Sequence, residues 1–196
     1  MPAYSYPSTN TELVRDLSLL DHSEGGFFVE TDRQEAQVPS PFANGEQRSL
    51  ATAIFYLLTY KEPRGVFHIN KSVTMHVLNQ GRATYTLITP PATPNDVPKI
   101  EYVTMGTDTA AGERRQLMVG TGVWKMSQIP QGDLNSAKAG GEQEQEKTGC
   151  LVTEVVTPGF AWEDHKFMTQ NELEGLFDGV KGGQEIVKEL SSYVKK

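Results

Sequence analysis

Residues 65–81, GVFHINKSVTMHVLNQG, decide the fold of this chain. Two short runs rich in β-branched and aromatic residues are separated by a polar break and bounded by glycines, which is typical of two strands and a turn. Strand alternation puts His68 and Asn70 on one face of the first strand and His76 on one face of the second. If the strands pair as a hairpin with those faces aligned, both imidazoles point into one half-apolar cavity. There they can act as acid, base or ligand, or each can be a hydrogen-bonded interior residue.

The same two-residue period continues on both sides of this stretch. Gly, Pro, Asn and Asp separate further runs of apolar and β-branched residues, and such punctuation marks short strands. The pattern predicts strands near residues 26–31, 50–59, 65–70, 73–79, 83–89, 99–105, 116–119, 122–129 and 150–157. About nine short strands with tight connections indicate an all-β sandwich or barrel.

Helical patterns are confined to the ends of the chain. Thr9 and Glu12 form a capping box before leucines at helical spacing, and weaker helical patterns cover residues 169–177 and 184–193. These segments predict a short N-terminal helix and short C-terminal helices.

Two polar stretches interrupt the β pattern. Residues 90–98 are rich in proline, which cannot donate ladder hydrogen bonds, and predict a hairpin loop. Residues 131–148 have the composition of a mobile loop or a frayed helix. Because no repeat of fixed period occurs, we expect a single domain over residues 1–196, with its core at about 22–167 and 131–148 as a flexible insertion.

Composition excludes several classes of partner. The 196 residues carry 18 Lys and Arg against 25 Asp and Glu, a net charge of −7, so nucleic acid and anionic membranes are not expected as partners. The lone cysteine, Cys150, excludes an intramolecular disulfide framework. The sequence shows no signal peptide and no membrane span, and the expected location is cytoplasmic. The expected partner is a small molecule.

Two charged residues stand in strands of otherwise apolar type. Lys125 lies in the middle of residues 122–129, where a charge is costly unless it faces a polar cavity or a carboxylate; it could instead extend its amine from an outward face. Glu154 lies within residues 150–157 and needs a cationic partner if it is buried. We therefore expect Lys125 or a protonated histidine to pair with Glu154.

The motifs together resemble the cupin superfamily, and more narrowly its fifth family. The matching segments run in the family's order over about three quarters of the chain. They are HSEGGFFVET at 22–31, ATAIFYLL at 51–58, the His68 block, GVW at 122–124 and VVTPGF at 155–160. The resemblance implies an all-β, cupin-type jelly-roll β-barrel (a double-stranded β-helix) and a homodimer.

The sequence departs from the superfamily at the metal-ligand positions. Metal-binding cupins use a His-x-His pair, a glutamate and a third histidine, whereas the corresponding positions hold His68, Asn70, Thr74 and Lys125. His76 could add one donor from a shifted position. Transition-metal sites need three or four converging donors, so we expect no metal and no cofactor.

Metal-free members of the superfamily include epimerases and related isomerases. Resemblance to them implies that His68 acts as general base on a small cyclic or carbonyl-containing molecule, in an isomerase-, epimerase- or cyclase-like reaction. Tyr56 or Lys125 would be the acid, and Glu154 or Glu30 would orient the imidazole.

The same residues suit a protein that binds a ligand without turnover. Phe28, Phe55 and Trp124 could form flat walls, and Thr31 and Gln116 could donate hydrogen bonds to the edge of a ring. Asn70 and His76, with Glu30, complete the expected ligand-binding residues. The alternative function is therefore binding of a nucleobase- or nucleotide-like molecule. His22 is expected to cap a turn or line the rim, and His165 to lie on the exterior.

Overall fold

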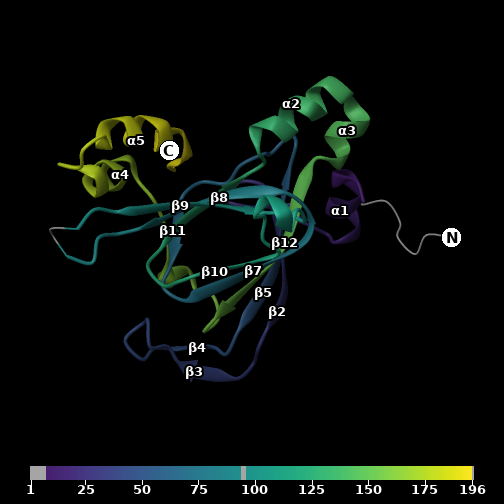
Figure 1. Cartoon of the computed structure of the whole chain (residues 1–196). Helices are drawn as coiled ribbons and strands as arrows, with labels where there is room; N and C mark the ends of the chain where they lie inside the picture. The colour runs from purple at the N-terminus through teal and green to yellow at the C-terminus, as the bar shows by residue number, and fades with distance from the viewer. Residues whose placement is uncertain (1–7, 94–95, 196) are drawn as a thin grey trace.

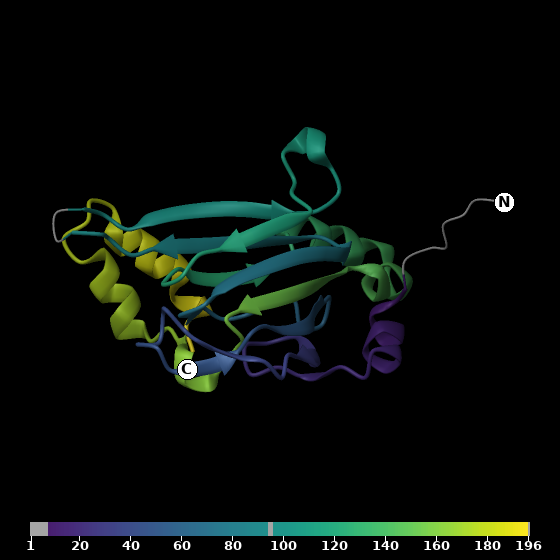
Figure 2. The same ribbon diagram turned by 90° about the horizontal axis from the view of Figure 1, so that it is seen from below.

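The computed structural model describes residues 8–93 and 96–195, and two facing β-sheets form its centre (Figures 1 and 2). The larger, sheet A, has the strand order β1-β2-β5-β12-β7-β10. Its strands are β1 (Leu20–Asp21), β2 (Phe27–Arg33), β5 (Thr52–Thr59), β12 (Gly149–Thr157), β7 (Val73–Gly81) and β10 (Gln116–Val119). All of its pairings are antiparallel.

The smaller sheet, sheet C, has the order β13-β6-β11-β8-β9 and is also antiparallel. Its strands are β13 (His165–Phe167), β6 (His68–Asn70), β11 (Trp124–Gln128), β8 (Ala83–Thr89) and β9 (Lys99–Met105). A separate hairpin, sheet B, pairs β3 (Gln37–Pro39) with β4 (Gln47–Ser49). Two stacked antiparallel sheets of this kind form the jelly roll that the sequence predicts, although the pairing does not close them into one barrel.

Three apolar clusters fix the layers. The cluster between the sheets combines residues of both, such as Leu58 and Val152 of sheet A with Tyr85 and Met105 of sheet C. A second cluster fills the outer face of sheet C, and a third covers the outer face of sheet A. Alternation along each strand therefore decides whether a side chain faces the interior or a helix.

Helices cover these two outer faces. Helix α1 (Asn10–Asp16) begins at the predicted capping box of Thr9 and Glu12 and packs on sheet A. Helices α4 (Gln170–Phe177) and α5 (Gly183–Leu190) cover sheet C, near the end of the chain (Figure 1). The 3-10 turns are η1 (Thr109–Ala111), η2 (Trp162–Asp164) and η3 (Ser191–Tyr193).

Residues 131–148 take the helical one of the two forms expected for them. This segment forms two helices, α2 (Gln131–Gly140) and α3 (Glu142–Lys147). Asn10 holds α3 against α1, since its amide donates to the carbonyls of Gln145 and Thr148 at 3.1 and 3.0 Å. A polar composition therefore concealed a segment that is fixed by long-range hydrogen bonds.

All nine predicted strands are present, with ends shifted by a few residues, but the hairpin considered for residues 65–81 does not form. Strands β6 and β7 do not form a hairpin: β6 pairs with β11 and β13 in sheet C, while β7 pairs with β12 and β10 in sheet A. Their inner faces oppose each other across the interior. His68 and His76 consequently approach the same space from different sheets.

No helix among the described residues is long and apolar enough to cross a membrane.

Candidate functional site

A cavity of about 400 Å³ opens between the sheets near the start of β2 and the end of β12. Its lining comprises His22, Glu24, Phe28, Glu30, Arg33, Thr52, Ile54, Asn70, Glu154, Val156, Phe160, Ala161, Trp162 and Glu163. Larger hollows beside α1 and α3 and between α4 and α5 lie outside the sheets. Of these three hollows, the cavity between the sheets is the one lined by the buried carboxylates Glu24 and Glu154. It is therefore the candidate site.

One cluster in this site joins the two sheets. Lys125 of β11 places Nζ 3.3 Å from His76 Nε2, and His76 Nδ1 lies 3.2 Å from Glu154 Oε1. Lys125 Nζ also lies 3.5 Å from Glu154 Oε2, which confirms the predicted ion pair. Because an ammonium group can only donate, Nε2 of His76 must accept and Nδ1 carries the proton. His76 is therefore a neutral link between the amine and the carboxylate.

Burial and charge set the protonation of this cluster. Burial alone would raise the pKa of Glu154, but His76 and Lys125 outweigh it and hold that pKa well below its ordinary value. Burial lowers the pKa of His76, and Lys125 lowers it further, against the opposing effect of Glu154. At neutral pH Glu154 is ionised and His76 is neutral. Glu154 is the member of the cluster that lines the cavity.

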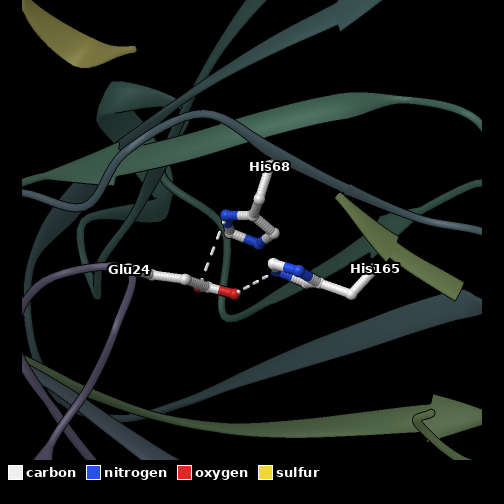
Figure 3. A group of neighbouring side chains, drawn as sticks. All are labelled: Glu24, His68 and His165. Atoms are coloured by element: carbon white, nitrogen blue, oxygen red, sulfur yellow. Dashed lines mark hydrogen bonds and ion pairs between the residues drawn. The ribbon is translucent and has the colours of Figure 1, made fainter. Parts of the chain in front are cut away.

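A second cluster surrounds Glu24, which lies in the turn between β1 and β2. His165 Nε2 lies 2.9 Å from Glu24 Oε1, and His68 Nδ1 lies 3.3 Å from Glu24 Oε2. The two imidazoles stack at 20° with their centres 5.4 Å apart, and each turns a ring nitrogen toward the carboxylate (Figure 3). His22 Nδ1 lies farther from this carboxylate, at 3.8 Å, and accepts a hydrogen bond from the backbone N–H of Glu24.

The groups of this second cluster also have shifted pKa values. Burial would raise the pKa of Glu24, but the imidazoles, His68 foremost, lower it to about 2. Burial lowers the pKa of His68 to about 4, because Glu24 only partly offsets the loss of solvent. At neutral pH the cluster holds an ionised carboxylate beside a neutral His68.

The structure brings most of the predicted site residues to this region. Phe28, Glu30, Asn70 and Glu154 line the cavity, and the buried residues Tyr56, His68, His76 and Lys125 lie outside that lining. Glu30 stands at the rim and pairs with Arg33 at 2.6 Å. The carboxamide oxygen of Asn70 is buried and has no hydrogen-bond partner in the described structure.

Tyr56 has a fixed hydrogen bond. Its hydroxyl donates to the carbonyl of Gly25 at 2.9 Å, and burial, with Glu24 and Glu154 nearby, raises its pKa well above the ordinary value. The phenol therefore remains protonated, and its proton is directed at a backbone carbonyl. It supports the turn that carries Glu24.

Three predicted ligand-binding residues lie elsewhere. Trp124 packs against α4 and α5 on the outer face of sheet C, because alternation on β11 directs Lys125 inward. Gln116 is exposed, since its neighbour Leu117 faces the core. Thr31 is exposed and donates to the carbonyl of Ala53 at 3.1 Å.

Two further expectations are corrected. Phe55 packs on the α1 side of sheet A rather than beside the cavity. His165 is not exterior: its side chain is 3% exposed, because β13 pairs with β6 and places His165 opposite Asn70. Aromatic rings of Phe160, Trp162 and Phe167 surround its imidazole. Cys150 is buried, and burial raises its pKa to about 12.

Sequence reasoning missed Glu24 and His165 as site residues. Glu24 was part of the family-like segment 22–31, beside His22 and before two glycines, and that position was the available signal. His165 had no comparable signal, because its partner strand lies almost a hundred residues earlier in the chain.

The superfamily's metal-ligand positions do not fit a metal in this chain. Of His68, Asn70, Thr74 and Lys125, only His68 is a usual metal donor, and Lys125 is engaged by His76 and Glu154. A different set comes together instead: Glu24, His68 and His165 each offer a ligand atom, and these atoms lie within 4.8 Å of one another.

The jelly roll with a polar cavity between its sheets defines the protein as a cupin. Residues 11–168 match the family model Cupin_5, described as Cupin superfamily (DUF985), and the chain belongs to that family. It is 33% identical over 193 residues to Uncharacterized protein YML079W of Saccharomyces cerevisiae, covering 94% of this chain and 88% of the yeast protein.

Two solved structures share the fold. A hypothetical protein from Leishmania major has a TM-score of 0.75 at 22% identity, covering 96% of this chain and 100% of its own. A protein from Shewanella oneidensis has a TM-score of 0.70 at 24% identity, covering 94% and 98%. At these identities the likeness establishes the architecture alone.

Proposed function

We propose that this cupin is an enzyme that moves a proton on a small cyclic or carbonyl-containing molecule, as isomerases, epimerases and cyclases do. One observation carries the proposal. Glu154, an ionised carboxylate, lines a cavity with apolar walls. It pairs with His76 and Lys125, which lie outside the lining. A carboxylate held in this way can take a proton from carbon next to a carbonyl, as general bases do.

The roles within the cluster follow from position. Glu154 contacts the ligand and accepts the proton, since His76 is fully buried and Lys125 is 2% exposed. His76 and Lys125 are positioning residues that keep Glu154 ionised and fix its direction. His68 as general base remains a prediction, but its place outside the cavity lining favours Glu154.

The second candidate is binding without turnover, and the polar floor of the cavity favours it. Glu24, Glu154 and the unpartnered oxygen of Asn70 are all hydrogen-bond acceptors. Phe28 and Phe160 supply aromatic wall. A nucleobase-like ring with amino and ring N–H groups would match both features.

Deuterium transfer tests the enzyme proposal. The purified protein is incubated in D₂O with a small-molecule extract of cells, and mass spectrometry follows every metabolite. We expect one metabolite to gain deuterium or change mass with the native protein. The signal should be lost with Glu154→Gln and retained with Glu163→Gln, a change at an exposed residue of the same cavity.

The alternative has a different outcome. If native mass spectrometry recovers one bound molecule unchanged, and no metabolite gains deuterium or changes mass, binding without turnover is the function. A reaction that survives in Glu154→Gln overturns the role of Glu154.

A further inference from the structure

We propose that Glu24, His68 and His165 form a binding site for a divalent transition-metal ion. This inference goes beyond the proposed proton transfer, which depends on Glu154. It also assigns a role to the three residues that differs from the general base expected at His68 and from the exterior position expected for His165.

Convergence of the three side chains is the first observation. They come from the turn before β2, from β6 and from β13, yet one possible ligand atom of each lies within 4.8 Å of the others. Figure 3 shows the Glu24 carboxylate facing both imidazoles. Because β13 pairs with β6, a strand almost a hundred residues earlier in the chain, the cluster is built by the fold rather than by a local motif.

The charge on Glu24 is the second observation. Its side chain is 11% exposed, and its ion-pair partners within residues 8–93 and 96–195 are imidazoles of His22, His68 and His165, with no lysine or arginine. The amine of Lys195, nearby in the fold, bonds instead to the carbonyl of Ser23. A buried carboxylate is costly without a compensating cation. A divalent ion would supply that charge.

The donor set selects the kind of ion. Two imidazole nitrogens and one carboxylate oxygen suit zinc, iron(II), manganese(II) or cobalt(II), and leave coordination positions free for water or a ligand. Magnesium and calcium prefer sets made only of oxygen atoms. The ligand class is therefore a first-row transition metal rather than an alkaline-earth ion.

The hydrogen bonds around the imidazoles fit ligand roles. Nδ1 of His68 lies 3.0 Å from the carbonyl of Val66, so its proton is donated to the backbone and Nε2 carries the lone pair. Metal-bound histidines have this kind of outer hydrogen bond. At His165, the ion would replace the proton that Nε2 shares with Glu24.

Ion pairs hold the residue next to His165, and the three-residue cluster adjoins the cavity. Asp164, directly before His165, is held by Arg48 at 2.8 Å and by Lys71 at 3.1 Å. Glu24 and Asn70 line the cavity, and the unpartnered oxygen of Asn70 could accept a hydrogen bond from a metal-bound water. A bound ion would consequently lie at the edge of the candidate site.

Cobalt(II) binding to the full-length, untagged protein tests the proposal. The protein is stripped with a chelator, dialysed and titrated with Co²⁺ under nitrogen while visible absorption is recorded. We expect one equivalent to bind with a dissociation constant of about 1 μM or tighter. Zn²⁺ should displace the cobalt and abolish the visible bands, as it does at sites of nitrogen and oxygen donors.

Variants locate the ion. Glu24→Gln and His165→Gln should each weaken binding by about 100-fold or more, while Glu101→Gln, a change at an exposed residue of β9 outside the cavity lining, should bind as the native protein does. Circular dichroism checks that each variant is folded. Since His165 is buried and its replacement can disturb folding, the native titration is decisive by itself.

Two results would overturn the proposal. One is a folded native protein that binds less than one equivalent of either ion, or binds it only at millimolar concentration. The other is native affinity in both folded ligand variants. Neither result bears on Glu154, whose role is tested by deuterium transfer alone.

Discussion

Glu24 and Glu154 line the same cavity and are equally buried, at 11% exposure of each side chain, but their neighbours differ. Glu154 pairs with a lysine, Lys125, which also contacts His76. Among the described residues Glu24 pairs only with imidazoles, and burial lowers the pKa of one of them, His68, to about 4. The charge of Glu154 is therefore compensated by a lysine of the same chain. Glu24 has no such partner among the described residues and is suited to bind a cation from outside.

This contrast predicts that breaking the Glu154 cluster has the largest effect on stability. Lys125→Met should lower the free energy of unfolding by about 3–5 kcal/mol, because it leaves a buried carboxylate without its cation. Urea denaturation measures the change. The double variant Lys125→Met/Glu154→Gln should recover a large part of the loss, and a cost below about 1 kcal/mol for the single variant would contradict the pairing.

Acidification should act on the imidazoles of both clusters. The pKa of His68 is lowered to about 4 and that of His76 is also lowered, so the unfolded chain binds protons below pH 6.5 that the folded protein does not. The free energy of unfolding therefore has its full value above pH 6.5 and falls as the pH approaches 4. The loss is about 1.4 kcal/mol per pH unit for each proton that only the unfolded chain binds.

Urea midpoints measured in chelator at a series of pH values from 7 to 4 test this dependence. The variant His68→Asn should show a shallower loss than the native protein. Below pH 4.5 Glu24 should add to the loss, because its folded pKa of about 2 lies below its ordinary value. A native stability that does not change between pH 6.5 and 4.5 would refute the neutral, buried imidazoles.

Removing the charge of Glu24 should cost less than breaking the Glu154 cluster. Glu24→Gln in metal-free protein leaves no buried lysine without a partner and keeps an acceptor for His165, so we expect a loss of about 1–2 kcal/mol. Urea denaturation of Glu24→Gln and Glu154→Gln, measured together, gives the comparison. A larger loss for Glu24→Gln would mean that a cation is already paired with it.

The smallest effect is expected at the rim. Glu30 and Arg33 form an ion pair whose side chains are 41% and 44% exposed, and such pairs contribute little to stability. Arg33→Ala should change the free energy of unfolding by less than about 1 kcal/mol. Thermal unfolding in low and high salt checks it, and a strong destabilisation would show that this pair belongs with the buried clusters.

The fold was predictable because its signals are local. Period-two alternation and turn residues identify strands such as β8 and β12 without knowledge of their partners. The same local rule also places Trp124 and Lys125 on opposite faces of β11. Because Lys125 faces the interior, alternation places Trp124 on the outer face of sheet C, and it cannot form a wall of the cavity.

The site was predictable only in part, because its geometry depends on pairings far apart in sequence. Lys125 and Glu154 could be paired from their cost of burial alone. His165 could not be placed, since it lies in a three-residue strand whose position follows from β6. Strands β6 and β7 could not be paired correctly for the same reason. A tight connection between two strands does not require that they share a sheet.

Zinc affinity of two matched variants tests most directly the claim that the two carboxylates have different tasks. Isothermal titration of metal-free Glu24→Gln and Glu154→Gln with Zn²⁺ compares two isosteric changes at the same cavity. We predict that Glu24→Gln weakens binding by about 100-fold or more while Glu154→Gln binds one equivalent as the native protein does. Equal affinity in the two variants would contradict it.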